Sequence, residues 1–373
     1  MCRPTLPIIL YWQPYFVNEY DMFVPDDGQI DCPYRCIHTA NHRLGAEAAV
    51  RVFHERRFNT ADLPPDNQYA LNVMHTLEPP FFTFSIYDEY MKSIPDYFNA
   101  TSSYRTMSAI YYPYDYFVHR TGNETIDEIW TQGQVNEMIA AKQKPVLIAV
   151  SNCNTHSARE KYVQRLQKHL PITIVGGCPF ANARCKNIVQ DRALHYDNPC
   201  MKEKVAEHYF YLAFENSICP EYQSEKFWRV KQLIVPVVLS RGVMPPHISN
   251  DTYIAASDFE SPKQLADYLQ HLMDNPSEYA KYFKWTQKYR KTSLSESEVR
   301  VSCQLCKLAY LGKQSRIADY KKYWSVDECP ANYSINLINN SKENPRNADK
   351  WEEKFTDLMS KTYREKRLEN ILL

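Results

Sequence analysis

Two ionisable residues stand where an open α/β sheet would present them to a ligand. Glu78 directly precedes Pro79 and Pro80, and because proline cannot continue a strand ladder, this carboxylate is predicted at a strand's carboxyl edge. Arg159 follows Ser151 by eight residues and would open the next helix. A carboxylate can take a proton from a hydroxyl group, and an arginine can hold a phosphate through two parallel hydrogen bonds. The plainer alternatives are a turn glutamate and a surface arginine.

A third candidate is the stretch 209–230, which reads YFYLAFENSICPEYQSEKFWRV. Its first six residues are nearly all apolar, which is typical of a strand buried on both faces. A polar turn and Pro220 follow, and 224–230 is predicted as a helix with Glu225 in its first turn. The free N–H groups at such a helix start, together with Lys226, would favour an anion. The hypothesis is a diphosphate or nucleotide-sugar site. The alternative is that Glu225 and Lys226 are ordinary solvated charges.

The surrounding elements alternate between apolar runs and amphipathic segments. This alternation predicts an α/β fold with two doubly wound, Rossmann-like domains facing each other across a cleft. The predicted ranges are 1–140 for the first domain, 145–312 for a nucleotide-binding domain and 313–373 for a polar tail with a terminal helix. We expect strands at 8–11, 68–75, 109–112, 146–150, 172–176, 209–214 and 235–239, and helices at 86–91, 132–143, 157–170, 201–208, 224–230, 261–273, 296–311 and 349–370, with 296–311 returning to cap the first domain.

Composition indicates an ordinary soluble globular protein. Of the 373 residues, 44% are hydrophobic and 24% are charged, and the formal net charge is zero. Such a balance gives no indication of a nucleic-acid or membrane-surface partner.

Cysteines and glycosylation sequons together favour a secretory lumen. Eleven cysteines are many for a reducing compartment. The alternative is a cytosolic chain with buried free thiols. We predict disulfides for the cysteines near the two ends, although Cys-x-x-Cys is also found in redox motifs and in zinc sites. Cys2 or Cys329 is expected to stay unpaired. The disulfide candidates are Cys32, Cys36, Cys303 and Cys306, and the sequons lie at Asn99, Asn123, Asn250, Asn332 and Asn339.

A family resemblance sharpens these predictions. The segment YLAFENSICPEYQSEKFWR at 211–229 resembles the donor-binding motif of the α-1,3/4-fucosyltransferases. The similarity continues through 235–239 and 258–266 and extends upstream through 150–159, 98–105 and 77–80, so it covers about 8–306. It implies the two-Rossmann-domain glycosyltransferase fold, called GT-B, with 1–140 as the acceptor-side domain and 145–312 as the GDP-fucose-binding domain.

The resemblance also implies roles for individual residues. Glu78 matches the general base that deprotonates the acceptor hydroxyl. Arg159 matches the phosphate-binding arginine and Lys226 the lysine that neutralises the leaving diphosphate, while Glu225 would stabilise a positive fucosyl centre. The other donor-binding candidates are Ser151, Asn152, Asn216, Tyr222 and Arg105.

The implied reaction is transfer of L-fucose from GDP-β-L-fucose to GlcNAc of a glycan. One direct displacement would invert the anomeric carbon and form an α-1,3 linkage. No metal or other cofactor is expected to be required, since the two cations fill that role, although Mn²⁺ stimulation is compatible with the family. Core GlcNAc, GalNAc-GlcNAc and lactosamine all stay open as acceptors.

Two alternatives stay open from the sequence. Ser240 and Ala255 depart from the family pattern near the donor motif, so a catalytically inactive binding relative is one alternative and a transferase of another sugar nucleotide is the second. The resemblance implies the Golgi lumen and an N-terminal membrane anchor. This sequence contains no run of 18 apolar residues that would form the anchor.

Overall fold

The computed structural model describes residues 6–13, 32–83, 97–185, 198–292, 294–312 and 323–343. The helices predicted at 86–91 and 349–370 lie outside these ranges. The chain forms two compact units, each built from several segments. Unit 1 comprises 1–130, 221–228 and 286–329, and unit 2 comprises 131–220, 229–285 and 330–373. The predicted domains were continuous ranges of the sequence. They could not include exchanged segments, because a sequence pattern locates a helix without showing which sheet it packs on.

Unit 1 contains a six-stranded parallel sheet in the order β2-β1-β3-β4-β5-β6. The order reverses at β1, so this sheet has a switch point between β1 and β3. The expected strands at 8–11, 68–75 and 109–112 are confirmed, whereas β2 and β5 were not predicted. The strands are β1 Ile8–Gln13, β2 Ile37–Thr39, β3 Val50–His54, β4 Leu71–Thr76, β5 Ala100–Ser103 and β6 Ile110–Tyr111.

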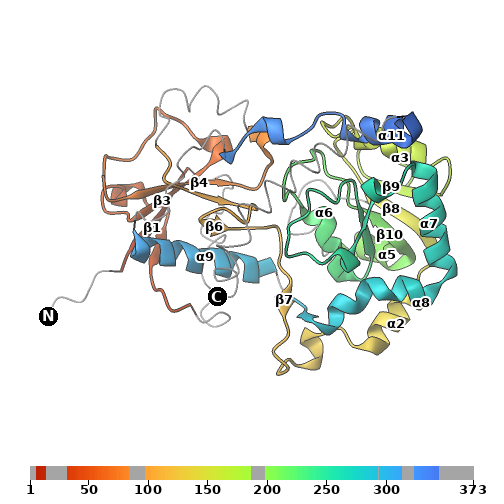
Figure 1. Cartoon of the computed structure of the whole chain (residues 1–373). Coiled ribbons are helices and arrows are strands. Elements are labelled where there is room, and N and C mark those ends of the chain that lie inside the picture. Colours follow the sequence, from red (N-terminus) through yellow and green to blue (C-terminus); the bar gives the residue numbers. More distant parts are fainter. Residues whose placement is uncertain are drawn as a thin grey trace. The chain divides into compact units, whose positions relative to one another are not determined.

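Helix α9 (Leu294–Leu311) runs along this first sheet (Figure 1). Its buried face places Val301, Leu305 and Leu308 in one apolar cluster with residues of β1, β3 and β4. The prediction that 296–311 returns to cover the first domain is therefore confirmed.

Two disulfides fasten α9 to the segment that enters β2. They join Cys32 to Cys303 and Cys36 to Cys306, with Cα–Cα distances of 5.7 and 5.4 Å. Nε2 of His38 lies 3.3 and 3.4 Å from the sulfurs of the second bridge. The predicted disulfides are confirmed over the redox and zinc alternatives.

Unit 2 contains a five-stranded parallel sheet in the order β12-β11-β10-β8-β9. The chain moves from β8 to β9 through α3 and then returns past β8 to β10 through α5. Right-handed crossovers in opposite directions place α3 and α5 on opposite faces of the sheet, so this unit is doubly wound. The elements are β8 Lys144–Ala149, α3 Arg159–Leu166, β9 Ile172–Val175, α5 Pro199–Glu207, β10 His208–Leu212, β11 Val235–Val238, β12 Ile254–Ala255 and α7 Pro262–Asp274.

Local capping explains where the unit 2 helices begin. Ser261 accepts a hydrogen bond from Gln264 N–H, and Pro262 occupies the first helical position of α7. Thr131 and Gln134 form a capping box at α2 (Gln132–Ala140). Helix α11 (Tyr333–Glu343) packs against α3 within the segment predicted to be a polar linker.

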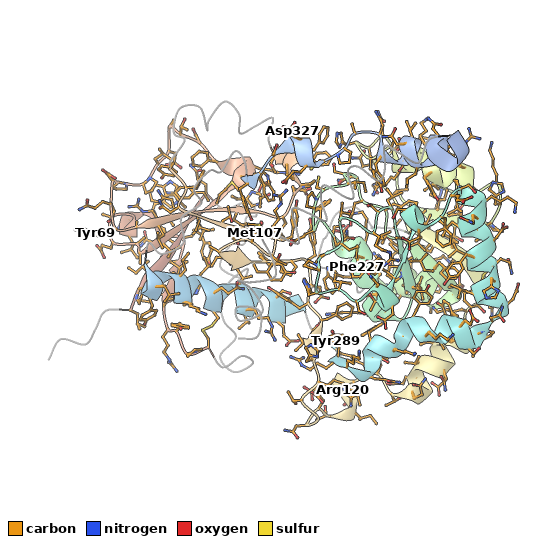
Figure 2. All side chains as sticks on the ribbon, in the orientation of Figure 1. Tyr69, Met107, Arg120, Phe227, Tyr289 and Asp327 are labelled. Carbon is orange, nitrogen blue, oxygen red and sulfur yellow. A yellow bond between two sulfur atoms is a disulfide. The ribbon has the colours of Figure 1, made fainter. Side chains whose placement is uncertain are left out.

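The remaining elements are short. In unit 1, β7 (Val118–His119) and β13 (Tyr289–Arg290) form an antiparallel ribbon. The N–H of Arg120 donates to the carbonyl of Lys288 (2.8 Å). Arg120 and Tyr289 accordingly lie in the same part of Figure 2. No helix among the described residues is long and apolar enough to cross a membrane. The bounds are η1 His42–Leu44, η2 Glu55–Arg57, β7 Val118–His119, η3 Ile126–Glu128, α6 Glu225–Trp228, η4 Arg229–Gln232, η5 Asn250–Thr252, η6 Ala256–Asp258, α8 Pro276–Tyr279, η7 Ala280–Gln287, β13 Tyr289–Arg290 and η8 Val326–Glu328.

Candidate functional site

In unit 2 the predicted donor-binding residues cluster at the switch point of the sheet. Ser151 and Asn152 follow β8, and Asn216 follows β10, which is the strand paired with β8. Ligands of open α/β sheets bind outside the carboxyl ends of strands at such a point. Ser151 and Asn152, which are distant from Asn216 in the sequence, therefore lie with it at one site in the folded unit.

Arg159 joins the two strand ends at this point. It opens α3 as predicted, and its guanidinium is buried and donates to the carbonyl oxygens of Phe214 (2.5 Å) and Asn152 (3.4 Å). Because these carbonyls lie beyond β10 and β8, the positive charge is fixed where both strands end. Arg159 is thus neither a surface arginine nor a flexible one.

Ser157 is a residue that the sequence reasoning missed at this point. Its hydroxyl donates to the carbonyl of Glu215 (2.6 Å), and its N–H donates to the carbonyl of Asn216 (2.9 Å). Ala158 then enters α3 with a left-handed backbone (φ 53°). A serine before a helix is an ordinary capping signal, and only the fold shows that Ser157 holds the turn after β10.

Asn216 presents an acceptor that the described part of the chain does not satisfy. Its Oδ1 is buried, and no hydrogen-bond partner for it exists among the described residues. A buried amide oxygen without a donor destabilises the folded state by about 1–3 kcal/mol. A bound molecule that donates a hydrogen bond would remove this penalty.

Gly176 shapes the edge of the sheet beside Asn152. Its φ is +131°, and a Cβ built on it would lie 2.0 Å from the carbonyl oxygen of Val150. The Cys153–Cys178 disulfide holds the same two loops together. Only glycine fits this close approach of the two backbones.

We therefore expect Gly176→Ala to lower the free energy of unfolding by at least about 2 kcal/mol, because the clash is with backbone and cannot be relieved by a side-chain rotation. Gly177→Ala is the matched control, since its Cβ would meet Ser151 at an ordinary 3.9 Å. Denaturant unfolding of both variants measures the effect. Equal stabilities would show that the loop adjusts freely.

The rest of the predicted donor motif belongs to unit 1. Tyr222 is buried, and its ring packs against Tyr104 and Tyr114 at centroid distances of 5.2 and 6.4 Å. Nζ of Lys226 lies 2.7 Å from Oγ of Ser224 and 3.1 Å from Oε1 of Glu225. The structure thus brings Lys226 and Glu225 together as a local ion pair, in which 15% of the lysine and 34% of the glutamate side chain is exposed.

The helix predicted at 224–230 is shorter than expected. Only α6 (Glu225–Trp228) is α-helical, and a 3₁₀ turn follows it. A four-residue helix has almost no macrodipole. The contribution of a helix dipole is therefore smaller than predicted, and the full positive charge at the start of this segment is that of the Lys226 side chain.

Arg105 is engaged within unit 1. Its guanidinium donates to the carbonyl of Tyr323 and to Oε2 of Glu328 (2.7 Å), and it stacks over Trp324 at 4.7 Å. These contacts give Arg105 a structural role in holding the segment 323–328. Its predicted donor contact stays a prediction.

Glu78 lies where the Pro-Pro sequence placed it. It follows β4, and its N–H donates to Oγ1 of Thr76, the last residue of the strand (3.1 Å). Oε1 of Glu78 lies 3.3 Å from Nη2 of Arg56, with 16% of the glutamate side chain exposed. The two side chains are thus paired at the edge of the sheet, and a carboxylate is one of the groups that can act as a general base.

A second carboxyl group stands beside Glu78. Glu55 follows β3, the neighbour of β4, and is fully buried. Burial is the largest cause of a pKa raised to about 8 for Glu55; the charge of Glu78 also raises this pKa, while Thr76 and Arg56 act to lower it. Glu55 is not among the residues that sequence reasoning singled out.

Comparisons with known proteins place both halves of the chain in one group. Residues 4–115 match the family model "Fucosyltransferase, N-terminal", and residues 139–328 match "Glycosyltransferase family 10 (fucosyltransferase) C-term". Together these models cover most of the described residues.

Individual relatives agree with the family models. The chain is 32% identical to human 4-galactosyl-N-acetylglucosaminide 3-alpha-L-fucosyltransferase FUT6 over 305 residues, which are 78% of this chain and 76% of the relative. It is 34% identical to the alpha-(1,3)-fucosyltransferase fut-1 of Caenorhabditis elegans over 62% of this chain, but this match spans only about half (52%) of the nematode protein. A crystal structure of alpha1,3-fucosyltransferase with GDP is 15% identical, with a TM-score of 0.48 over 76% of this chain and 82% of that one.

Proposed function

Since the chain belongs to glycosyltransferase family 10, the fucosyltransferases, we propose that it transfers L-fucose from GDP-β-L-fucose to GlcNAc of a glycan. The observation that best supports donor binding is the buried Oδ1 of Asn216 at the switch point of unit 2. A hydroxyl or N–H group of the donor would satisfy it. Arg159 fixes a positive charge at the same strand ends.

The chemistry we propose is a single inverting displacement that forms an α-1,3 linkage. Glu78 accepts the proton of the attacking hydroxyl group, and the oxygen of that group bonds to the anomeric carbon as the bond to GDP breaks. Negative charge then develops on the departing diphosphate, and fixed cations stabilise it most in the transition state. Lys226 and Arg159 are the cations proposed for this role, and Glu225 is proposed to stabilise the positive fucosyl centre.

The proposal extends to the compartment and to the absence of a required metal. Ten cysteines in the described residues are disulfide-bonded, Cys329 included, which is typical of an oxidising lumen and supports the Golgi. The expectation that Cys329 could stay unpaired is wrong, and Cys2 lies outside the described residues. Four of the five sequon asparagines are exposed, and Asn99 is half-buried. Because two side-chain cations are proposed to neutralise the diphosphate, transfer should persist in a chelator.

Titration calorimetry with GDP tests the donor site. Asn216→Ala is expected to weaken GDP-fucose or GDP binding about tenfold, the effect of losing one buried hydrogen bond. Asn136→Ala, on the exposed surface of α2, is the control and should bind as wild type. GDP binding without turnover would support the inactive-relative alternative, and unchanged affinity in Asn216→Ala would contradict the proposed site.

A further inference from the structure

Glu221 is a buried acidic residue to which the proposed reaction gives no role. It stands between Pro220 and Tyr222 in the predicted donor motif, and 2% of the residue is exposed. Its backbone φ is +61°, in the left-handed region that residues with a Cβ seldom occupy. A residue other than glycine keeps such a conformation only where the surrounding contacts hold it there. The contacts of Glu221 therefore show how this part of the chain is held.

The carboxylate of Glu221 accepts both donors of Thr106. Its Oε2 accepts the backbone N–H of Thr106 at 2.5 Å, and its Oε1 accepts the hydroxyl group at 2.8 Å. Thr106 is also buried, so water competes little for either bond. Hydrogen bonds to a carboxylate are shorter and stronger than those between neutral groups. Two such bonds to one residue fix both the distance and the direction of the glutamate side chain.

Thr106 belongs to a turn that is braced by hydrogen bonds of its own. The N–H of Ser108 donates to the carbonyl of Arg105 (2.9 Å), and the N–H of Arg105 donates to Oγ of Ser103 (3.2 Å). The hydroxyl oxygens of the two serines are 2.6 Å apart. Ser103 is the last residue of β5, a strand within the six-stranded sheet. The turn therefore fixes Thr106 relative to the sheet of unit 1.

The other end of this contact lies in the segment that carries the proposed donor-binding charges. Glu225 and Lys226 begin α6, in the same segment of unit 1 as Glu221. Helix α6 has four residues, so its own hydrogen bonds do little to fix its position. The ring of Tyr222 packs on Tyr104, which lies in the braced turn. Contacts with this turn thus hold the segment in place at the residues that precede α6.

We propose that Glu221 is a positioning residue for the donor: by binding Thr106 it fixes the approach to α6, and so it sets where the ammonium group of Lys226 stands. This inference rests on the proposed function for the role of Lys226. The contact between Glu221 and Thr106 is independent of that function. Glu221 is not proposed to touch the donor or the reacting atoms, so it acts through Lys226.

Donor kinetics test this positioning role. Glu221→Gln keeps the size of the side chain, but its amide nitrogen is a donor and cannot accept the second bond. We expect kcat for fucose transfer to fall about 10- to 100-fold, the effect of displacing a reacting or charged group by about 1 Å. The loss should appear more in kcat than in KM for the donor, as expected for Lys226 itself. Thr106→Val removes only the hydroxyl donor and should give a smaller loss of the same kind.

A double-mutant cycle with Lys226 separates positioning from general damage to the fold. If Glu221 acts through Lys226, Glu221→Gln should change kcat by less than about twofold in a Lys226→Ala background. Independent effects would multiply, and that result would overturn the proposal. Glu296→Gln is the matched control, since Glu296 is also a buried glutamate of unit 1 held by two hydrogen bonds to one residue, Arg290. It should retain nearly full activity.

Hydrogen exchange gives a readout that needs no transfer. Loss of the contact should speed amide exchange in 222–228 in both Glu221→Gln and Thr106→Val, whereas exchange in β8 of unit 2 should match wild type. If wild type transfers no fucose but 222–228 exchanges faster in the variants, the proposed function fails and the role of Glu221 in holding α6 stands. Unchanged exchange of 222–228 in both variants, or equally faster exchange in β8, would overturn the inference.

Discussion

Replacing Glu78 with glutamine is expected to lower kcat for fucose transfer by about 100- to 10,000-fold, the usual contribution of a positioned general base. The acceptor hydroxyl must lose its proton as it attacks, and an amide cannot accept that proton. Glutamine keeps the size of the side chain and can still contact Arg56, so the fold should persist. Steady-state assays with GDP-fucose and a GlcNAc-containing acceptor measure the effect.

The control for this prediction is a glutamate with similar surroundings and no assigned role. Glu296 has 11% side-chain exposure and pairs with Arg290, whereas Glu78 has 16% and pairs with Arg56. Glu296→Gln should retain nearly full activity. If the two variants lose activity equally, or if Glu78→Gln stays active, Glu78 is not the base. GDP affinity should be the same in both, because the base does not bind the donor.

Replacing Lys226 with alanine is expected to lower kcat by about 100- to 1,000-fold, which is typical of removing one group that stabilises transition-state charge. The negative charge on the diphosphate grows as the sugar–phosphate bond breaks, so the loss should appear more in kcat than in KM for the donor. Lys226→Arg keeps the charge with a different shape and should recover part of the rate. Donor saturation curves separate kcat from KM.

Lys204 provides the comparison for Lys226. The two lysine side chains are 18% and 15% exposed, and both pair with neighbouring glutamates. Lys204 lies on α5 in unit 2, and its ion pairs with Glu203 and Glu207 are within that helix. Lys204→Ala should therefore transfer fucose at the wild-type rate. A wild-type kcat in Lys226→Ala would assign the charge stabilisation to another group.

Strand prediction succeeded where burial on both faces demanded apolar β-branched runs. Residues 146–150, 172–176 and 235–239 became β8, β9 and β11 for this reason. Strand β5 was missed because its four buried residues read Ala-Thr-Ser-Ser, which contains no apolar run. The short strands β2 and β12 carry too few residues for a period to appear.

The division into units could not be predicted from chain order. Segment 221–228 and helix α9 lie in the second half of the sequence but belong to unit 1. The sequence pattern of α9 shows which face of the helix is apolar. It does not show which sheet that face packs on, because this depends on the side chains of the sheet. The length of α6 was overestimated for a related reason, since 225–232 divides between α-helix and 3₁₀ turn.

The site was predicted in part. Asn216 was predicted after a buried strand and Arg159 at the start of a helix, and the structure has Asn216 after β10 and Arg159 as the first residue of α3. Sequence reasoning gave no indication that Arg159 bonds two backbone carbonyls or that Glu55 shares Arg56 with Glu78. These contacts depend on which strands are neighbours, and spacing along one chain does not contain that information. The catalytic roles themselves stay predictions.

Mass spectrometry of glycans incubated with GDP-fucose tests the central claim most directly. The acceptor set should contain core GlcNAc, GalNAc-GlcNAc and lactosamine, with wild type and Glu78→Gln compared in parallel. We predict that wild type adds one deoxyhexose to at least one acceptor, that linkage analysis places it at the 3-position of GlcNAc, and that Glu78→Gln adds almost none. A folded wild-type protein that binds GDP and adds no fucose to any acceptor would contradict the account.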